Sequence, residues 1–497
     1  MNIIERIENI AAQTPNKTAF SSRFGKLTYK ELWDASGKLA TWIDKTQGES
    51  KKPVIVYGHK NPWMPVCFFA SVRSGRAYCP VDISMPEERV FQIIDKIGDP
   101  LVLSTEPLEL KGAHSLEELK EIAEAEETIS RDKWISGDDI FYIIFTSGST
   151  GLPKGVKITM DNLVSFTDWS RRLGAEFDGE ERIFLNQAPL SFDLSVMDIY
   201  TGLTSGSTIC SIDKDLQQDN TDMLNYIKEN NVSYWVSTPS FADLAMTAPE
   251  FNTREFPCLR NFFFCGERLS VSTAKELKKR FPDSIVINTY GPTESTVAVT
   301  DVTITDEMLE LGELPIGKTK PGTQIVIIDE DGKSLSKGEA GEMVIIGDTV
   351  SPGYFEDEER TRKVFGITER GQRSYRTGDK GFYGEDDMLY ISGRIDLQIK
   401  FHGYRIELGD IEQNLLAIEA VKGACVVPKK KEGKIQQIVA FLVCEGIEGS
   451  FADRKMIRNS LKERLPEYMV PKKIIFVDSI PMTNNGKIDR KKMEASL

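Results

Sequence analysis

The sequence predicts an α/β protein with a large N-terminal domain of parallel and mixed sheets with helices, followed by a small α+β C-terminal domain. Three observations predict this fold class. Short apolar runs alternate with amphipathic stretches through the first three hundred residues, as in sheets joined by crossover helices. Residues 324–346 instead show two β-type runs around a turn, and the pattern changes again after residue 394. A length of 497 residues also exceeds that of one compact domain.

The first hundred residues show the strand–helix alternation most clearly. Thr28 and Glu31 have the spacing of a helix capping box, and so do Ser84 and Glu87. Because the predicted strands are separated by helices, we expect them to lie parallel in one sheet. The predicted helices lie at residues 3–12, 28–43, 66–72 and 84–94, and the predicted strands at 54–57, 78–81 and 101–103.

A loop rich in glycine and hydroxyl residues follows the apolar run at 140–144, which predicts a buried strand. Glycines allow a backbone to turn its N–H groups toward an anion, and a lysine adds positive charge. The alternative is a flexible Ser/Gly linker, and the spacing is not that of the P-loop. We predict that this loop binds a triphosphate through Thr146, Ser147, Gly148, Ser149, Thr150, Gly151 and Lys154.

The chain after this loop repeats the alternation. A helix is expected within residues 156–166, with Asp161 placed to start it. Apolar runs then predict strands at 183–185, 234–236, 262–264 and 285–287.

A polar turn follows the strand predicted at 285–287. Polar residues after a parallel strand lie at the carboxyl edge of the sheet, where ligands bind in open α/β folds. Tyr290 is placed to stack on a purine, and Glu294 is a candidate ligand of a hard cation such as Mg²⁺. The alternative is an ordinary Gly-Pro turn with a helix-starting glutamate. The turn comprises Asn288, Thr289, Tyr290, Gly291, Pro292, Thr293 and Glu294.

Two other polar segments carry candidate residues. Cys265, Gly266 and Glu267 follow the strand at 262–264, and Gly266 permits a ligand to approach the backbone closely. Taken alone, Cys265 fits a small core residue better. Asp193 is a candidate partner for a substrate ammonium, although an N-cap of the helix expected at 194–203 explains it more simply.

Three segments in the last quarter carry further candidates. Asp379 is a candidate ligand for ribose hydroxyls, with a hairpin-type turn as the alternative. Residues 394–397 mark a predicted domain boundary, and 324–346 predict a small antiparallel subdomain. Lys487, taken alone, fits an exposed lysine of the tail.

The composition excludes several classes of protein. The net charge of −14 argues against a general nucleic-acid binder and against binding to an anionic membrane. No apolar run reaches membrane-spanning length, and the N-terminus lacks a signal-peptide core. Seven scattered cysteines fit reduced thiols and a cytoplasmic location. With three histidines, chemistry based on histidine clusters is not expected.

Together these segments resemble the adenylate-forming superfamily, which includes amino-acid adenylation domains and acyl-CoA synthetases. The resemblance runs from Leu27 to Lys487 and is specific as a set. It implies an N-terminal adenylation core at 1–394 with a β-barrel-like subdomain, and a mobile C-terminal domain at 395–497. Asp396 matches the family's hinge position.

The resemblance also implies roles for the candidate residues. The phosphate loop and the segments around Gly266, Glu267, Asn288 to Thr293, Asp379 and Arg394 are expected to bind ATP. Glu294, with Thr146, is expected to hold Mg²⁺. Lys487 is expected to be catalytic and to contact both the nucleotide and the amino acid. Asp193, Cys265, Val297 and Lys487 are expected to surround the substrate.

Among family branches, the chain most resembles free-standing ligases that activate D-alanine. The implied reaction forms D-alanyl-AMP and transfers the D-alanyl group to the phosphopantetheine of a D-alanyl carrier protein, for lipoteichoic acid. Because only ten residues follow Lys487, no attached carrier domain is expected. The alternatives are an activator of L-alanine, glycine or serine, an acyl- or aryl-CoA ligase, and a non-catalytic scaffold.

Overall fold

The computed structural model describes all residues except 126, 148–152, 175–181, 432–433, 448 and 483–487. The chain forms two compact units. Unit 1 comprises Met1–Asp82, Asp99–Ile144 and Gly155–Ile395, and unit 2 comprises Ile83–Gly98, Phe145–Lys154 and Asp396–Leu497. The sequence did not predict that two segments from the first part of the chain belong to the unit that contains the C-terminus.

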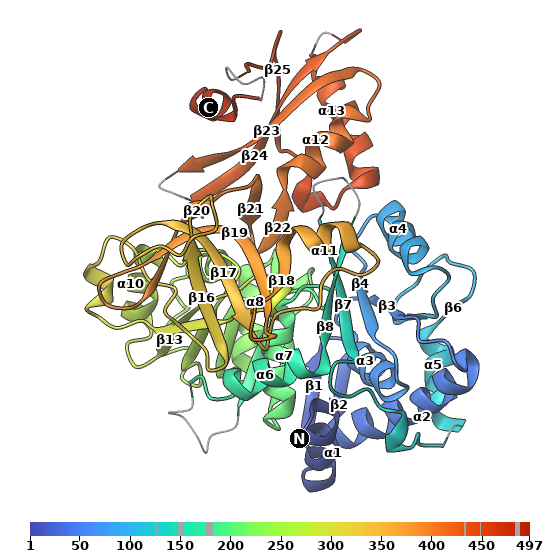
Figure 1. Cartoon of the computed structure of the whole chain (residues 1–497). Coiled ribbons are helices and arrows are strands. Elements are labelled where there is room, and N and C mark those ends of the chain that lie inside the picture. The colour runs from blue at the N-terminus through green and yellow to red at the C-terminus, as the bar shows by residue number, and fades with distance from the viewer. Residues whose placement is uncertain (126, 148–152, 175–181, 432–433, 448, 483–487) are drawn as a thin grey trace. The chain divides into compact units, whose positions relative to one another are not determined.

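A nine-stranded mixed sheet forms the centre of unit 1 (Figure 1). Its six middle strands are parallel, from β13 to β1, while β2, β14 and β15 pair antiparallel at the two ends. In spatial order the strands are β15 (Lys318–Thr319), β14 (Thr300–Thr303), β13 (Ile285–Tyr290), β12 (Asn261–Phe264), β11 (Tyr234–Ser237), β9 (Ile183–Asn186), β10 (Thr208–Ser211), β1 (Thr18–Ser22) and β2 (Gly25–Thr28).

A six-stranded sheet contains the strands predicted near the N-terminus. The pairs between β6 and β7 are parallel, as the strand–helix alternation predicted. In spatial order the strands are β6 (Ala113–His114), β5 (Val102–Ser104), β3 (Val54–Gly58), β4 (Tyr78–Asp82), β7 (Ile140–Thr146) and β8 (Lys154–Thr159).

A five-stranded antiparallel sheet confirms the subdomain predicted after residue 324. It contains β16 (Thr323–Ile328), β17 (Gly341–Gly347), β18 (Phe365–Ile367), β19 (Arg373–Tyr383) and β20 (Leu389–Arg394). The C-terminal part of unit 2 has a hairpin, β21 (Gln398–Phe401) with β22 (Tyr404–Glu407), and a sheet of β23 (Val421–Lys431), β24 (Lys434–Cys444) and β25 (Lys473–Phe476). The predicted fold class is therefore confirmed.

The described part of the chain also contains α-helices, of which α7 is buried along its whole length and α11 has no buried residue. They are α1 (Ile3–Gln13), α2 (Tyr29–Gln47), α3 (Trp63–Arg73), α4 (Glu87–Ile97), α5 (Leu116–Ala125), α6 (Met160–Ser170), α7 (Leu194–Thr204), α8 (Asn220–Glu229), α9 (Pro239–Ala245), α10 (Val271–Arg280), α11 (Glu358–Val364), α12 (Leu408–Leu416), α13 (Phe451–Arg464) and α14 (Arg490–Ala495). The capping box predicted at Thr28 and Glu31 begins α2.

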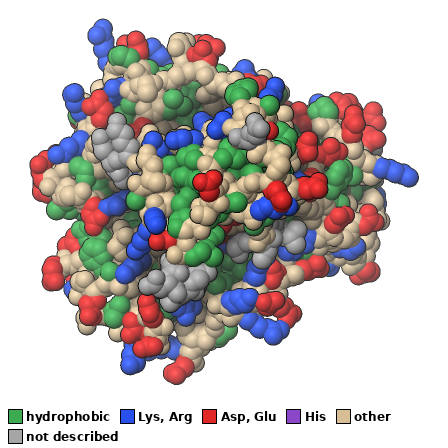
Figure 2. Space-filling model, turned by 90° about the horizontal axis from the view of Figure 1, so that it is seen from above, with side chains coloured by type: hydrophobic (Ala, Val, Ile, Leu, Met, Phe, Trp, Pro, Cys, Tyr) green, Lys and Arg blue, Asp and Glu red, His purple; other side chains and the backbone are tan. Residues whose placement is uncertain are grey.

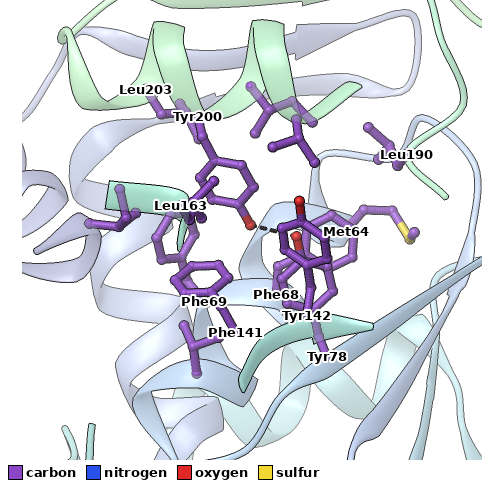
Figure 3. Close-up of a cluster of buried hydrophobic side chains, with 14 of the residues drawn as sticks. Met64, Phe68, Phe69, Tyr78, Phe141, Tyr142, Leu163, Leu190, Tyr200 and Leu203 are labelled. Carbon is purple, nitrogen blue, oxygen red and sulfur yellow. Dashed lines mark hydrogen bonds between the residues drawn. The ribbon is translucent and has the colours of Figure 1, made fainter. Parts of the chain in front are cut away.

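One core cluster in unit 1 joins the six-stranded and nine-stranded sheets through α3, α6 and α7. Figure 3 shows its aromatic centre, where the hydroxyls of Tyr78 and Tyr200 lie 2.7 Å apart. The buried apolar faces of α3 and α7 pack here, so the position of the first turn of α7 is set by a dense core.

Two predicted helix starts are wrong. Helix α4 has Pro86 at its N-cap, so Ser84 and Glu87 form no capping box. A residue before proline avoids the helical conformation, which prevents an earlier start. Residues 154–159 form strand β8, and the adjoining helix α6 is capped by Thr159 with Asn162, so Asp161 does not start it.

Charged side chains of both signs are interspersed with hydrophobic ones on the face shown in Figure 2. In the part of the chain that the structure describes, no helix is long and apolar enough to cross a membrane.

Candidate functional site

The described ends of the predicted phosphate loop make defined contacts within unit 2. Ser147 Oγ donates to the carbonyl oxygen of Arg405 at 2.9 Å, and Lys154 Nζ lies 3.9 Å from Glu407 Oε1. Thr146 Oγ1 is buried, and no described group bonds it. The loop residues Gly148, Ser149, Thr150 and Gly151 lie outside the described residues.

Asp193 occupies the N-cap position of α7, but its side chain does not cap the helix. Instead, Thr293 Oγ1 donates to Asp193 Oδ2 at 2.6 Å. The structure therefore brings together the predicted ammonium ligand and a residue of the polar turn, a hundred positions away. Asp193 is thus the N-cap residue by position, as the simpler explanation has it, but its side chain makes no cap bond. The carboxylate therefore has a partner within the protein, Thr293, without any bound substrate.

Cys265 and Val297 form a contact in the same region of unit 1. Both are buried, and the thiol of Cys265 donates weakly to the carbonyl oxygen of Val297 over 3.6 Å. Cys265 follows β12 directly, so the carboxyl end of a parallel strand delivers it, as the sequence predicted.

The loop that carries Val297 is strained. Thr296 has a φ of 60° and Val297 a φ of 68°, although both are β-branched. Such residues in the left-handed region cost about 1–3 kcal/mol each and occur where the surroundings hold them. Here Thr296 Oγ1 donates to the carbonyl oxygen of Thr349 at 2.8 Å. Gly291 completes the tight turn, since a Cβ there would lie 2.5 Å from Ala298 Cα.

Tyr290, Asp379 and Arg394 form a second group. Tyr290 Oη donates to Asp379 Oδ2 at 2.6 Å, and Arg394 forms an ion pair with the same carboxylate. Burial, together with Asp379, raises the pKa of Tyr290 well above its usual range, so its hydroxyl keeps its proton and remains a donor. Tyr290, which the sequence predicted to stack on a purine, thus bonds through its hydroxyl to Asp379, the predicted ligand of the ribose.

Several predicted nucleotide contacts use their side chains within the protein. Asn288 Nδ2 donates to the Pro315 carbonyl at 2.8 Å, and Thr289 Oγ1 to the Phe264 carbonyl at 2.9 Å. Glu267 accepts the hydroxyl of Ser240. Gly266, with a φ of 88°, has the backbone freedom predicted for it, and Pro292 precedes the short helix Thr293–Ser295.

Glu294 is fully buried and is held by a residue that the sequence did not single out. Tyr354 Oη donates to Glu294 Oε1 at 2.8 Å, and the N–H of Ser351 donates to the Glu294 carbonyl at 2.9 Å. Tyr354 also pairs with Val156 of β8 through a backbone bridge. No local signal marks Tyr354, because its partners lie far away in the sequence.

The described residues contain no group of three His, Cys, Asp or Glu side chains that is able to hold a metal ion alone. A cation here would need further oxygen ligands. Mg²⁺ commonly takes one or two protein oxygens and completes its shell with substrate phosphates and water. The carboxylate of Glu294, in unit 1, and the hydroxyl of Thr146, in unit 2, are each an oxygen of this chemical kind.

Two remaining predictions concern the C-terminal region. Lys487 lies outside the described residues. Asp396 lies between β20 and β21, is exposed, and accepts the N–H of Gln398 at 3.2 Å. Its neighbour Ile395 donates its N–H to the Gly378 carbonyl.

The chain matches known families over most of its length. Residues 7–355 match the model described as AMP-binding enzyme, and residues 410–487 match the model described as AMP-binding enzyme C-terminal domain. Curated proteins named D-alanine–D-alanyl carrier protein ligase are similar throughout. Those of Bacillus cytotoxicus and Bacillus licheniformis are each 44% identical, over 503 and 502 residues, with 99% of both chains covered.

Solved structures share the fold. Holo-PA1221, an NRPS protein containing adenylation and PCP domains and bound to a vinylsulfonamide inhibitor, superposes with a TM-score of 0.84 at 27% identity. The match covers 100% of this chain and 84% of that one. The Vibrio cholerae adenylation domain AlmE, in complex with glycyl-adenosine-5'-phosphate, has a TM-score of 0.83 at 23% identity, with 99% and 97% covered. The second likeness supports the fold alone.

Proposed function

Because the chain belongs to the AMP-binding enzyme family, we propose that it is a ligase that joins D-alanine to a carrier protein in two steps. The first step consumes ATP and forms D-alanyl-AMP and pyrophosphate. The second transfers the D-alanyl group to the phosphopantetheine thiol of a D-alanyl carrier protein. Similarity to the Bacillus ligases over 99% of both chains supports this substrate and this partner.

The observation that carries the proposal is the position of the Asp193 carboxylate. It is not used as a helix cap, and it faces Thr293, next to Glu294. A carboxylate in a partly buried site attracts the ammonium of an amino acid, because opposite charges stabilise each other more strongly there than in water. An acyl or aryl acid has no group to match it.

Our assignment of the nucleotide contacts follows the two groups described above. Asp379 and Arg394 bind the ribose, and Asn288 to Tyr290 flank the adenine with Gly266 and Glu267. Thr293 and the loop from Thr146 to Lys154 contact the phosphates. Glu294 and Thr146 would hold Mg²⁺, which would supply positive charge to the phosphates of ATP.

In the first step, a carboxylate oxygen of D-alanine attacks the α-phosphorus, and the bond from that phosphorus to the oxygen bridging to the β-phosphate breaks. Chemistry of this kind depends on positioning and on charge neutralisation. We assign the second task to Lys487, whose ammonium would contact both the attacking carboxylate and the α-phosphate. The match to the C-terminal family model, which extends to residue 487, supports this assignment.

In the second step, the carrier's thiol loses its proton to solvent, its sulfur attacks the carbonyl carbon, and AMP leaves. We propose that residues 395–497 move as a domain against residues 1–394 between the steps, with Asp396 as the hinge. Its exposure, and its place between two strands, suit a residue that absorbs a change in backbone angles.

We assign selectivity for D-alanine to Cys265, which would crowd the methyl group of the L-enantiomer, while Val297 would line the other wall of the pocket. Supply of D-alanyl groups for lipoteichoic acid, in the cytoplasm, is the setting that we propose. No disulfide joins any of the seven cysteines, all of which lie in the described part of the chain, and this supports a reducing compartment.

The test is ATP–pyrophosphate exchange by the purified full chain with D-alanine, L-alanine, glycine, L-serine, propionate and benzoate. We expect D-alanine to support the fastest exchange. Mass spectrometry should then show a D-alanyl thioester on a carrier protein loaded with phosphopantetheine. Exchange with propionate or benzoate alone would make the chain an acyl or aryl ligase, and no exchange would end the proposal.

A further inference from the structure

A buried polar network lies beneath the loop that carries Asp193. Lys60 is 0% exposed, and its Nζ donates to Asn186 Oδ1 at 2.6 Å and to the Ala188 carbonyl at 2.5 Å. Asn186 Nδ2 donates to Asp198 Oδ1 at 2.8 Å, and Ser211 Oγ donates to Asn186 Oδ1 at 2.6 Å. All five residues are buried.

The network holds both ends of that loop. Asn186 is the last residue of β9, and the chain passes through Ala188 to Asp193 before α7 begins. Asp198 lies on α7, just after the loop has ended. Leu190, in the middle of the loop, is buried in the core cluster (Figure 3). The path of the chain from Asn186 to α7 is therefore fixed by Lys60 at its start, the core at its middle and Asp198 at its end.

Lys60 reaches this loop from the other sheet of unit 1. It follows β3 of the six-stranded sheet, whereas Asn186 ends a strand of the nine-stranded sheet. The preceding residue makes a parallel connection: His59 Nδ1 lies 2.6 Å from Asp82 Oδ2, and its Nε2 accepts the N–H of Lys214 at 3.1 Å. His59 and Lys60 thus join the carboxyl edges of the two sheets.

Burying the ammonium of Lys60 between two sheets costs free energy, because the charge loses its contact with water. Burial lowers the pKa of Lys60 to about 8, although the negative charges of Asp198, Asp82 and Asp213 act to raise it. Asp198 Oδ2 is also buried, and no described group bonds it. Apolar side chains of the same volume would often be as stable, so a geometric role explains the network better than a contribution to stability.

We infer that Lys60 is a positioning residue of the amino-acid site: through Asn186, Ala188 and Asp198 it holds the Asp193 carboxylate where the substrate's ammonium binds. This inference rests on the proposed role of Asp193. Asp193 makes no side-chain cap bond to α7, so its place depends on the Thr293 hydroxyl that holds its Oδ2 and on the backbone that the network holds.

The test compares D-alanine with propionate, which has the same carbon chain and no ammonium. Lys60→Met keeps the length and removes the donors. A displaced Asp193 should lower kcat/KM for D-alanine by about 10-fold to 100-fold, and leave kcat/KM for propionate and the KM for ATP unchanged. General destabilisation would not lower the ratio of kcat/KM for D-alanine to kcat/KM for propionate.

Lys320→Met is the matched control. Lys320 is also buried, and its Nζ donates to Ser165 Oγ at 2.9 Å and to the Pro321 carbonyl at 3.0 Å. The Lys320→Met variant should be less stable than the wild type but keep the wild-type ratio of kcat/KM for D-alanine to kcat/KM for propionate. If Lys60→Met does not fold, Asp198→Asn provides the second variant, with a fall in the same direction. An unchanged ratio, or an equal loss for both acids, would overturn the inference, whereas a wild-type enzyme without D-alanine exchange would overturn the proposed function instead.

Discussion

The sulfur of Cys265 lies 3.6 Å from the carbonyl oxygen of Val297, so a thiol at the end of β12 touches the strained loop that follows Glu294. Both residues are buried. The contact sets the spacing between two walls of the amino-acid pocket that we propose.

Cys265→Ala removes the sulfur from this contact. If the sulfur crowds the methyl group of L-alanine, the variant should raise the ratio of L-alanine to D-alanine activation by about 10-fold, since discrimination by one methyl is limited to a few kcal/mol. Pyrophosphate exchange with each enantiomer measures the ratio. Cys210→Ala, another buried cysteine, on β10, should leave it unchanged. The same ratio in Cys265→Ala would remove Cys265 from this role.

Lys487→Ala should lower the rate of D-alanine-dependent pyrophosphate exchange by about 100-fold or more, because one preorganised cation at the reacting centre is lost. Binding of ATP, measured by calorimetry, should stay within a few-fold. Lys491→Ala, which changes an exposed lysine nearby, is the control. Exchange at the wild-type rate in Lys487→Ala would contradict the assignment.

Tyr290→Phe removes the hydroxyl that donates to Asp379. The buried carboxylate then keeps Arg394 and loses one donor, which should lower the free energy of unfolding by about 2 kcal/mol. We also expect a higher KM for ATP with the KM for D-alanine unchanged, since Asp379 is assigned to the ribose. Denaturant unfolding and exchange kinetics measure the two effects, and a selective rise in the KM for D-alanine would count against that assignment.

Asp396→Pro restricts the backbone at the proposed hinge. The adenylation rate should be kept, and the rate of thioester formation on the carrier should fall, because only the second step needs the rearranged state. Asp396→Ala keeps the freedom of the backbone and should leave both rates unchanged. Equal loss of both rates in the proline variant would show that Asp396 has another role.

The buried ammonium of Lys60 gives a prediction about pH. The unfolded chain keeps this proton up to its ordinary pKa of 10.5, whereas the folded chain releases it near pH 8. Between these values the unfolded state binds more protons, so the stability of the wild type should rise with pH relative to Lys60→Met. Urea unfolding of both proteins at pH 7.5 and 9.5 measures this change. A difference in stability that does not vary with pH would contradict it.

Patterns within short stretches of sequence predicted several strands and some of the candidate site residues. Short apolar runs located β3, β4, β12 and β13, and the rule that polar residues follow parallel strands selected Cys265 and Thr293. The same reasoning failed where two signals overlap. Strand β8 runs into α6 without a loop, so its apolar residues were counted with the helix.

The contacts that fix the site are not local, and no spacing in the sequence reveals them. Tyr354 reaches Glu294 across 60 residues, and Lys60 reaches Asn186 across 126. Each of these pairs joins segments that end or follow strands of two different sheets, and their meeting depends on the tertiary fold. Predicting Tyr354 or Lys60 requires the topology as well as the motifs.

The left-handed backbone of Thr296 and Val297, in the pocket wall that we propose, is strained, and a loop distant in the sequence holds it in place. Thr349, just beyond β17 in the antiparallel subdomain, accepts the hydroxyl of Thr296. A substitution that shifts this loop would let the backbone relax and retract Val297. In the pocket that we propose, residues that never touch the amino acid would therefore affect the choice of substrate.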